Sequence, residues 1–165
     1  MTNNVFLSLG SNLGDRMANL RLAVSLLYRQ GYAVTTQSSG VYETAAWGDI
    51  PQPDFLNAVI QVETVLEPIA LMEAVLAVER QMGRVRTQKW GPRTIDIDIL
   101  FWGETVIATE RLTVPHPYVQ DRRFILKPLK EIAPDFMHPV LLQTIENLWS
   151  SCIDPLEVRG YSERL

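Results

Sequence analysis

Residues 90–101 hold the stretch that decides the fold, Trp90-Gly91-Pro92-Arg93-Thr94-Ile95-Asp96-Ile97-Asp98-Ile99-Leu100-Phe101. A rigid turn leads into an apolar run typical of a β-strand, in which alternate residues point to opposite faces. Asp96 and Asp98 therefore share one face, and the alternating isoleucines point the other way into a core, namely Ile95, Ile97 and Ile99. Two neighbouring carboxylates on a strand are unfavourable unless a paired group or a cation compensates them. The spacing suggests a divalent-metal site, although a half-exposed strand with a polar face would carry the same pattern.

The composition fits one globular domain over residues 1–165. Hydrophobic residues make up 47% of the chain and charged residues 21%, which is ordinary for a soluble domain of this size. The single cysteine, Cys152, excludes an internal disulfide and favours a reducing compartment. The chain starts Met1-Thr2-Asn3-Asn4, unlike a signal peptide, and no apolar run approaches the about 20 residues of a membrane span. We therefore expect a cytoplasmic protein without a membrane segment.

Charge is distributed unevenly along the chain. The net charge of −4 argues against a general affinity for nucleic acid. Residues 80–130, however, hold ten of the 15 Lys and Arg together with five acids, a local net charge of +5. A basic region around the aspartate pair indicates a local anionic ligand, and a chance cluster on a solvated face is the alternative.

Hydrophobic periodicity predicts the element order βαββαβ. The expected elements are strands over residues 5–9, 32–42, 55–66 and 95–101, and helices over residues 17–27 and 68–82. This is the order of a ferredoxin-like sandwich, an α+β fold in which an antiparallel sheet carries two helices on one face. Beyond it we expect a loop through residues 121–124, a helix near residues 141–151 and a C-terminal extension without a clear pattern.

Two further segments invite a functional interpretation. The glycine-rich run Gly10-Ser11-Asn12-Leu13-Gly14 between a strand and a helix could cradle phosphate, but it lacks the Gly-Lys-Ser/Thr ending of a P-loop. We expect a structural turn there. Phe55 and Asn57 share a face at the start of a strand, where a flat ring beside a bidentate amide suits a planar heterocycle. An aromatic residue of the core is the alternative for Phe55.

The candidate chemistry is that of magnesium and nucleotide phosphates. Mg²⁺ is held by one or two carboxylates together with phosphate oxygens of a substrate, and arginines neutralise phosphate charge. The aspartate pair lies between basic loops, followed by Thr113 and His116. His116 and His138 are far apart in the sequence and no Cys/His cluster suggests zinc. No serine lies in a nucleophile elbow.

Six blocks, taken together, resemble a known family. They are Leu9-Gly10-Ser11-Asn12-Leu13-Gly14, Tyr42-Glu43-Thr44, Gln52-Pro53-Asp54-Phe55-Leu56-Asn57, Gly83-Arg84-Val85-Arg86, the stretch from Trp90 to Ile99, and Leu112-Thr113-Val114-Pro115-His116-Pro117. In order and spacing they resemble the 6-hydroxymethyl-7,8-dihydropterin pyrophosphokinases of folate biosynthesis, from about residue 5 to about residue 134. The resemblance implies the ferredoxin-like α+β sandwich that the element order also predicts.

The resemblance also implies a reaction and a set of site residues. ATP, as co-substrate, would give its β,γ-pyrophosphoryl group to the hydroxymethyl oxygen of 6-hydroxymethyl-7,8-dihydropterin, and AMP would leave. Asp96 and Asp98 would hold two Mg²⁺ ions, and together with Arg84 and Arg93 they would be the catalytic residues. The implied ATP contacts are Glu79, Arg84, Arg86, Trp90, Arg93, Ile99, Arg111, Thr113, His116 and Arg122. The implied pterin contacts are Thr44, Ala45, Trp47, Phe55, Asn57, Trp90, Asp96 and Phe124.

Some positions depart from the family pattern, and two other functions compete with it. Ala45 stands where many relatives have proline, and Trp47 is bulkier than the common aliphatic residue, which bears on how the pterin loop closes. A different two-metal phosphoryl or nucleotidyl transferase would also suit a carboxylate pair on such a sheet. An RNA-binding module of the RRM type shares the element order, but its aromatic strand motif is absent. We expect a monomer whose only partners are the two small-molecule substrates.

Overall fold

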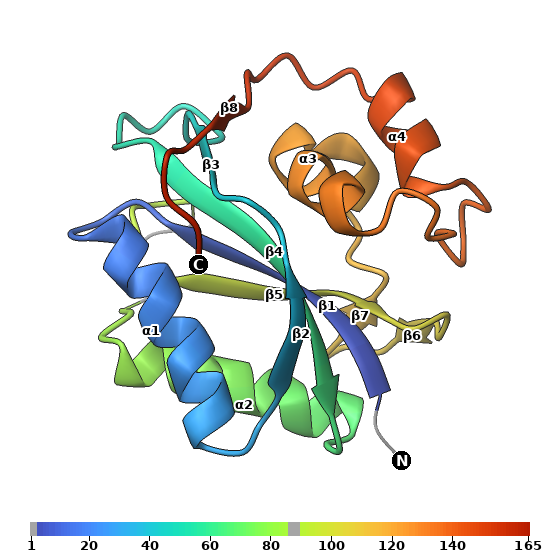
Figure 1. The fold of residues 1–165 in the computed structure, drawn as a ribbon, viewed down its shortest axis with the longest axis horizontal. Coiled ribbons are helices and arrows are strands. Elements are labelled where there is room, and N and C mark those ends of the chain that lie inside the picture. Colours follow the sequence, from blue (N-terminus) through green and yellow to red (C-terminus); the bar gives the residue numbers. More distant parts are fainter. Residues whose placement is uncertain (1–2, 86–89) are drawn as a thin grey trace.

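An antiparallel sheet with helices on both faces forms the centre of the computed structural model, which describes residues 3–85 and 90–165 (Figure 1). Its strands are β1 (Asn3–Ser11), β2 (Val34–Ser38), β3 (Tyr42–Thr44), β4 (Phe55–Thr64), β5 (Asp96–Trp102) and β8 (Arg159–Gly160). The hydrogen-bonded order is β5-β1-β4-β3-β8, and β2 also pairs with β4. Two short strands, β6 (Ile107–Ala108) and β7 (Thr113–Val114), form a separate hairpin.

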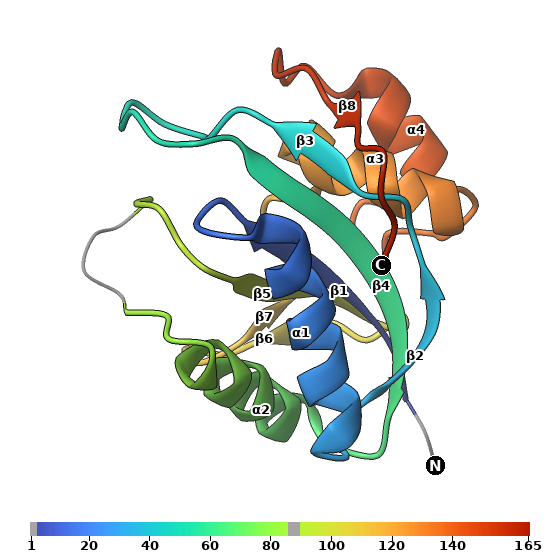
Figure 2. The same cartoon turned by 60° about the vertical axis from the view of Figure 1, so that its left-hand side comes forward.

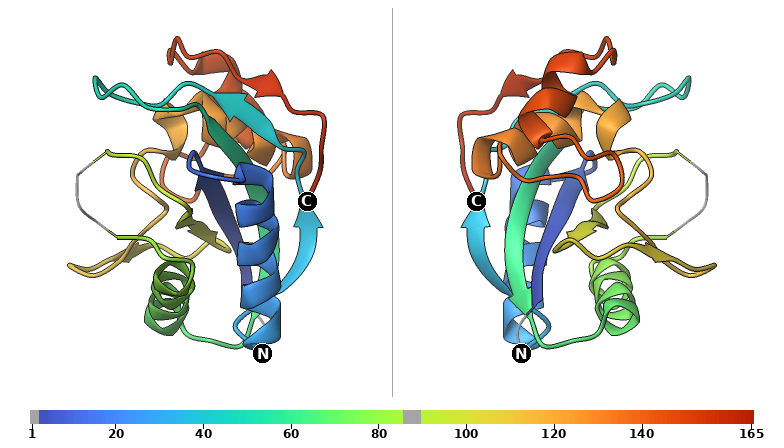
Figure 3. Two further views of the ribbon diagram at one scale, coloured as in Figure 1. Left: turned by 90° about the vertical axis from the view of Figure 1, so that its left-hand side faces the viewer. Right: turned by 90° about the vertical axis from the view of Figure 1, so that its right-hand side faces the viewer.

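Helices α1 (Arg16–Arg29) and α2 (Pro68–Gln81) cover one face of the sheet (Figure 3). Asp15 caps α1 by accepting a hydrogen bond from the backbone N–H of Ala18 at 3.0 Å. Proline at the first position of α2 is favourable because that N–H has no intrahelical partner. The apolar stripes of both helices pack on strand residues such as Leu7, Leu9 and Ile97. The α+β class, the antiparallel sheet and this helical layer confirm the expectation.

Helices α3 (Arg123–Ile132) and α4 (Ile145–Ser151) cover the opposite face. Side chains of α3 pack there against Phe6 of β1, Val59 of β4 and Phe101 of β5. The expected loop through residues 121–124 is therefore wrong from Arg123 onward, where α3 begins after the 3-10 turn η1 (Val119–Asp121). Among the residues described, no helix has the length and apolar character needed to cross a membrane.

Two other boundaries differ from the sequence expectation. The single strand expected over residues 32–42 is divided into β2 and β3, because Ser39 interrupts it. Its backbone N–H donates to the Val59 carbonyl at 2.9 Å, and its hydroxyl accepts from the Val59 N–H at 3.0 Å. The patternless C-terminal extension returns to the sheet as β8, which pairs with β3.

Candidate active site

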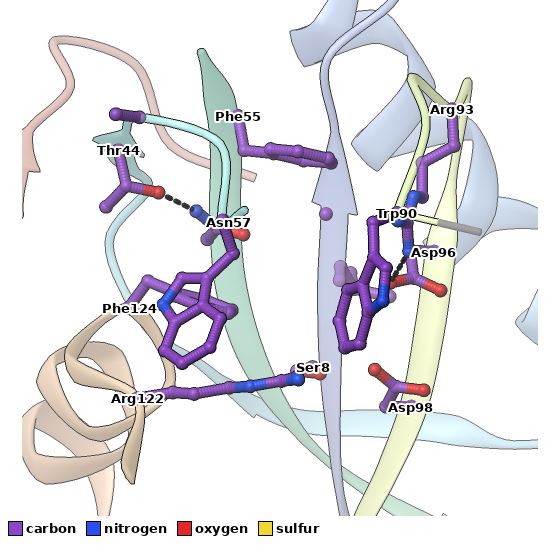
Figure 4. A pocket seen from close by; sticks show the side chains of 14 residues that line it. Ser8, Thr44, Phe55, Asn57, Trp90, Arg93, Asp96, Asp98, Arg122 and Phe124 are labelled. Atoms are coloured by element: carbon purple, nitrogen blue, oxygen red, sulfur yellow. Dashed lines mark hydrogen bonds and ion pairs between the residues drawn. The ribbon is translucent and has the colours of Figure 1, made fainter. Parts of the chain in front are cut away.

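A pocket opens at one end of the sheet, on the face covered by α3 and α4 (Figure 4). Three strands contribute side chains to the lining of this pocket. These side chains lie on the same face of the sheet as the buried core, beyond the point where the core ends. They are Ser8 and Gly10 on β1, Phe55 and Asn57 on β4, and Asp96 and Asp98 on β5. The remaining lining residues are Leu9, Thr44, Ala45, Trp47, Trp90, Arg93, Arg122 and Phe124. Every pterin contact that the resemblance implies therefore lies around one pocket.

One carboxylate of the β5 pair is fully engaged by arginines. Asp96 Oδ1 accepts from Arg84 Nη1 at 2.7 Å, and Asp96 Oδ2 accepts from Arg93 Nη1 at 2.9 Å. Arg84 Nη1 also donates to both carboxylate oxygens of Glu79, which is buried at the end of α2. Opposite charges at such distances hold both arginines in place. This cluster of Glu79, Arg84, Arg93 and Asp96 joins α2, the segment before β5, and β5 itself.

The other carboxylate, Asp98, is in a different environment. No hydrogen-bond donor or ion-pair partner reaches it from the part of the chain that the structure describes, and it faces the pocket (Figure 4). Burial raises the pKa of Asp98 to about 7, and the nearby carboxylates of Asp96 and Glu79 raise it further. The charges of Arg122 and Arg84 offset this only in part, and a carboxylate held close to other carboxylates has the electrostatics of a cation ligand.

His116 and Arg122 bring hydrogen-bond donors to the same region. His116 Nδ1 accepts from the backbone N–H of Tyr118 at 3.2 Å, so the proton of the neutral ring lies on Nε2. Burial lowers the pKa of His116 to about 4, and the neighbouring Arg122 contributes to the shift. His116 is therefore a neutral donor at neutral pH.

Arg122 is surrounded by aromatic rings. Its guanidinium carbon lies 4.9 Å from the ring centroid of Tyr118 and 5.6–5.7 Å from those of Trp47, Trp90 and Phe124. Stacking on aromatic faces stabilises a guanidinium but leaves its N–H groups unsatisfied, and Arg122 Nε is a buried donor that no described residue accepts from. An anionic ligand entering the pocket would meet this donor.

The opposite end of the pocket is polar and neutral. Asn57 Nδ2 donates to Thr44 Oγ1 at 2.8 Å, and both side chains are buried. A Cβ atom at Gly10 would lie 3.2 Å from Asn57 Oδ1, a tight contact, and 3.6 Å from Phe55 Cδ1, an ordinary one, so a larger residue at this position would press on the Asn57 amide. The amide and hydroxyl retain donors and acceptors for the edge of a flat ligand beside the Phe55 ring.

Asn12 is a residue of the site that sequence reasoning missed. Its Oδ1 accepts from the Arg93 N–H at 2.8 Å, and its Nδ2 donates to Gln52 Oε1 and to the Pro53 carbonyl, both at 2.9 Å. Gln52 Nε2 in turn donates to the Trp90 carbonyl at 2.8 Å. The run of residues 10–14 is thus a turn that ties together the loops on both sides of the pocket. These bonds join residues 40 and 81 positions apart, so no local pattern could reveal them.

Several expected nucleotide contacts lie outside the pocket. Arg111 is exposed and pairs with Glu73 at 2.5 Å, and Thr113 is exposed on β7. The Ile99 side chain is buried in the core, so only its backbone could meet a ligand. Arg86 lies outside the described residues. The nucleotide assignments of these four residues stay predictions.

Comparisons with known proteins agree on one family. The family model "7,8-dihydro-6-hydroxymethylpterin-pyrophosphokinase (HPPK)" matches residues 6–134. The 2-amino-4-hydroxy-6-hydroxymethyldihydropteridine pyrophosphokinase of Bacillus subtilis (strain 168) is 44% identical over 132 residues, which cover 80% of this chain and 79% of the relative. The protein with the same name from Methylorubrum extorquens is 46% identical over 133 residues, covering 80% and 84%.

The fold has relatives among solved structures. Wild-type HPPK-DHPS of Plasmodium falciparum with pteroate superposes with a TM-score of 0.71 at 20% sequence identity. The match covers 91% of this chain but only 42% of the solved one, so this chain spans less than half of that longer protein. At this identity the likeness shows the fold alone.

Proposed function

Because the chain belongs to the 7,8-dihydro-6-hydroxymethylpterin-pyrophosphokinase family and is an ATP-dependent pyrophosphokinase of folate biosynthesis, we propose the following reaction. The β,γ-pyrophosphoryl group of ATP is transferred to the hydroxymethyl oxygen of 6-hydroxymethyl-7,8-dihydropterin, and AMP is released. One observation carries the proposal: a single pocket places the Thr44–Asn57 pair and the Phe55 ring at one end and the Asp96–Asp98 pair at the other. A planar substrate bound at the first end would extend its substituent toward the second.

The pterin would be held by shape and by its polar edge. Phe55 on β4 and Phe124 on α3 both border the pocket, and a flat ring between two aromatic faces gains stacking and apolar burial. Asn57 and Thr44 would pair with the donors and acceptors of the ring edge. Trp47 and Trp90 are both 42% exposed at the rim, where they could cover a bound ring.

The β5 carboxylates fit a role in holding Mg²⁺ shared with a nucleotide. No group of three or more His, Cys, Asp or Glu side chains that could hold a metal occurs among residues 3–85 and 90–165. Mg²⁺ usually takes only one or two protein carboxylates and completes its shell with phosphate oxygens and water, and no described residue forms a hydrogen bond or ion pair with Asp98. We propose that Asp96 and Asp98 hold two Mg²⁺ ions. When bound, the ions would supply neutralisation of phosphate charge and a lowered pKa for the attacking hydroxyl.

The chain's cationic and neutral donors would orient the phosphates. Arg84 and Arg93 are pre-organised by Asp96 and Glu79 and retain N–H groups that can reach phosphate oxygens, which stabilises charge as it shifts in transfer. Arg122 would use its unpartnered Nε, and His116 would donate through Nε2. Such donors cost no reorganisation during the reaction because packing already fixes them.

A product assay tests the proposal directly. The protein is incubated with Mg-ATP and 6-hydroxymethyl-7,8-dihydropterin, and the nucleotides are separated by chromatography. We expect AMP in equal amount to a pterin diphosphate. ADP as the nucleotide product, or free pyrophosphate without a modified pterin, would contradict the proposal and favour another phosphoryl or nucleotidyl transferase.

The proposal includes the setting of the enzyme. The strand order β5-β1-β4 with β2 and β3 beyond it, antiparallel throughout, supports a ferredoxin-like core within one domain over residues 1–165. We also propose a monomer whose partners are the two small-molecule substrates. A cytoplasmic location is consistent with a free, buried Cys152.

A further inference from the structure

The C-terminal segment returns to the wall of the pocket. Strand β8 pairs with the outer edge of β3, with Arg159 opposite Glu43 and Gly160 opposite Tyr42. The Tyr161 N–H continues the pairing by donating to the Val41 carbonyl at 2.9 Å. Figure 2 shows β8 beside β3 at the base of the protruding loop that joins β3 to β4. This segment lies outside residues 6–134, which the family model matches.

The Arg159 side chain joins the two ends of that loop. Its Nη2 lies 2.9 Å from Asp54 Oδ2, just before β4, and 3.4 Å from Glu43 Oε1 on β3. The residue after Glu43 is Thr44 and the residue after Asp54 is Phe55. Both of these line the pocket, and they are paired opposite each other in the β3–β4 ladder. Arg159 therefore closes the loop one residue away from two pterin-facing positions.

A second arginine, Arg16, contacts the same two residues, Glu43 and Asp54. Arg16, at the start of α1, donates from Nη1 to Glu43 Oε2 at 2.6 Å and to the Asp54 carbonyl at 2.9 Å. Its hydrogen bond lowers the pKa of Glu43, so this carboxylate stays ionised and available to Arg159. Neighbouring strand residues point to opposite faces, so contacts to Glu43 are made on the face away from Thr44.

We propose that Arg159 is a positioning residue for the pterin end of the pocket, setting the separation of Thr44 and Phe55 through Glu43 and Asp54. The proposal rests on the proposed function. The ion pair between Arg159 and Asp54 is about half exposed, with side-chain exposures of 45% and 42%, so its effect should be modest in size. It should nevertheless be specific to one substrate, because the Arg159 side chain contacts Glu43 and Asp54 at the pterin end, whereas Arg84 and Arg93 hold Asp96 at the other end.

The test measures binding of each substrate separately. Fluorescence of 6-hydroxymethylpterin gives its Kd in the presence of Mg²⁺ and a non-hydrolysable ATP analogue, and titration with the analogue alone gives the nucleotide Kd. We expect the pterin Kd of Arg159→Ala to rise by about five-fold, which is the size of effect that the loss of exposed ion pairs at one site produces. The nucleotide Kd should be unchanged, and Arg159→Lys should recover most of the pterin affinity. Asp54→Asn should weaken pterin binding similarly and add little to Arg159→Ala.

A matched control separates positioning from general anchoring of the C-terminal segment. Glu163→Ala breaks the 3.2 Å ion pair with Arg21, which is similarly exposed but lies away from the loop, and its pterin Kd should match that of the wild type. Equal losses for both substrates, a normal pterin Kd in Arg159→Ala, or an equal loss in Glu163→Ala would overturn the proposal. If the wild-type protein itself does not bind the pterin, the proposed function fails, and the positioning role fails with it. The two failures are thus distinguishable.

Discussion

Asp96 and Asp98 share a face of β5, but only Asp96 is neutralised by neighbouring arginines. Asp98 faces the pocket with a pKa raised by burial and by nearby carboxylates to about 7. A carboxyl whose pKa is higher in the folded than in the unfolded protein binds its proton more tightly when folded. Its contribution to stability is present at low pH and is lost as the pH rises toward the folded-state pKa.

The ligand-free protein should therefore become more stable at pH 8 when Asp98 is replaced by asparagine. We expect the free energy of unfolding of Asp98→Asn to rise by on the order of 1 kcal/mol at pH 8 and to change little at pH 4. Urea unfolding at the two pH values measures this. The same variant should lose turnover by at least about a hundred-fold, because it would lack one of the two proposed Mg²⁺ ligands.

Replacement of an exposed aspartate provides the control for this experiment. Asp135→Asn should change neither turnover nor the free energy of unfolding appreciably, since Asp135 is exposed and does not line the pocket. Equal stabilisation by Asp98→Asn at pH 4 and pH 8 would contradict the raised pKa of Asp98.

At the residue scale, the sequence could predict only those features of the site that depend on neighbouring residues. The common face of Asp96 and Asp98, and that of Phe55 and Asn57, follow from strand alternation alone. The contacts of Arg159 could not be predicted, because its partners Asp54 and Glu43 are 105 and 116 positions away. A long-range ion pair leaves no periodic signal in one sequence.

At the scale of elements, the pocket depends on how three loops are held together. Asn12 bonds to the loop before β4 through Gln52 and Pro53, and to the loop before β5 through Arg93. It is 1% exposed, so its partners would be left unsatisfied inside the protein if the side chain were removed. Phe55 and Trp90, which follow or belong to these loops, line the pocket where we propose that the substrates bind.

Asn12→Ala should accordingly weaken the binding of both substrates, whereas Arg159→Ala should weaken the binding of the pterin alone. We expect the free energy of unfolding to fall by about 2 kcal/mol, because the hydrogen-bonding groups that Asn12 satisfies would be left unpaired inside the protein. We also expect the Kd values of both substrates to rise. Calorimetric titration with the ATP analogue and with hydroxymethylpterin measures the two affinities. The control is Asn19→Ala, because the Asn19 side chain on α1 donates to Ser11 Oγ and to the Leu13 carbonyl, neither of which lies in the loops before β4 and β5. A loss confined to one substrate would show that Asn12 does not couple the loops.

Elements with a strong apolar period were predictable, and those fixed by context were not. Helices α1 and α2 and strands β4 and β5 carry clear patterns. Helix α3 contains Pro128, which removes a hydrogen bond and normally costs about 3 kcal/mol in a helix interior. Burial of Leu126 and Leu129 against the sheet offsets this cost. Strand β8 pairs through the backbone over only two residues, too few for a side-chain pattern.

At the scale of the whole molecule, the sheet lies between two helical layers. One face of the sheet contributes only to the core, and the other contributes to the core and to the pocket. The α1–α2 face is core along its length. On the α3–α4 face the core ends partway along β1, β4 and β5, and the polar residues beyond it form the pocket. The same sheet thus carries both the stabilising core and the pocket, so ligand binding should be linked to global unfolding.

This linkage gives a prediction about metal removal. ATP at about 100 times its Kd stabilises a one-site protein by about 2.7 kcal/mol, which corresponds to a rise in Tm of about 5–10 °C for a domain of this size. We expect that rise with Mg-ATP in a thermal unfolding scan, and its loss when EDTA removes Mg²⁺, because repulsion between Asp98 and the phosphates is then uncompensated. The unfolding transition should remain single in both conditions. An equal Tm rise with ATP and EDTA would show that the β5 carboxylates do not act through a metal.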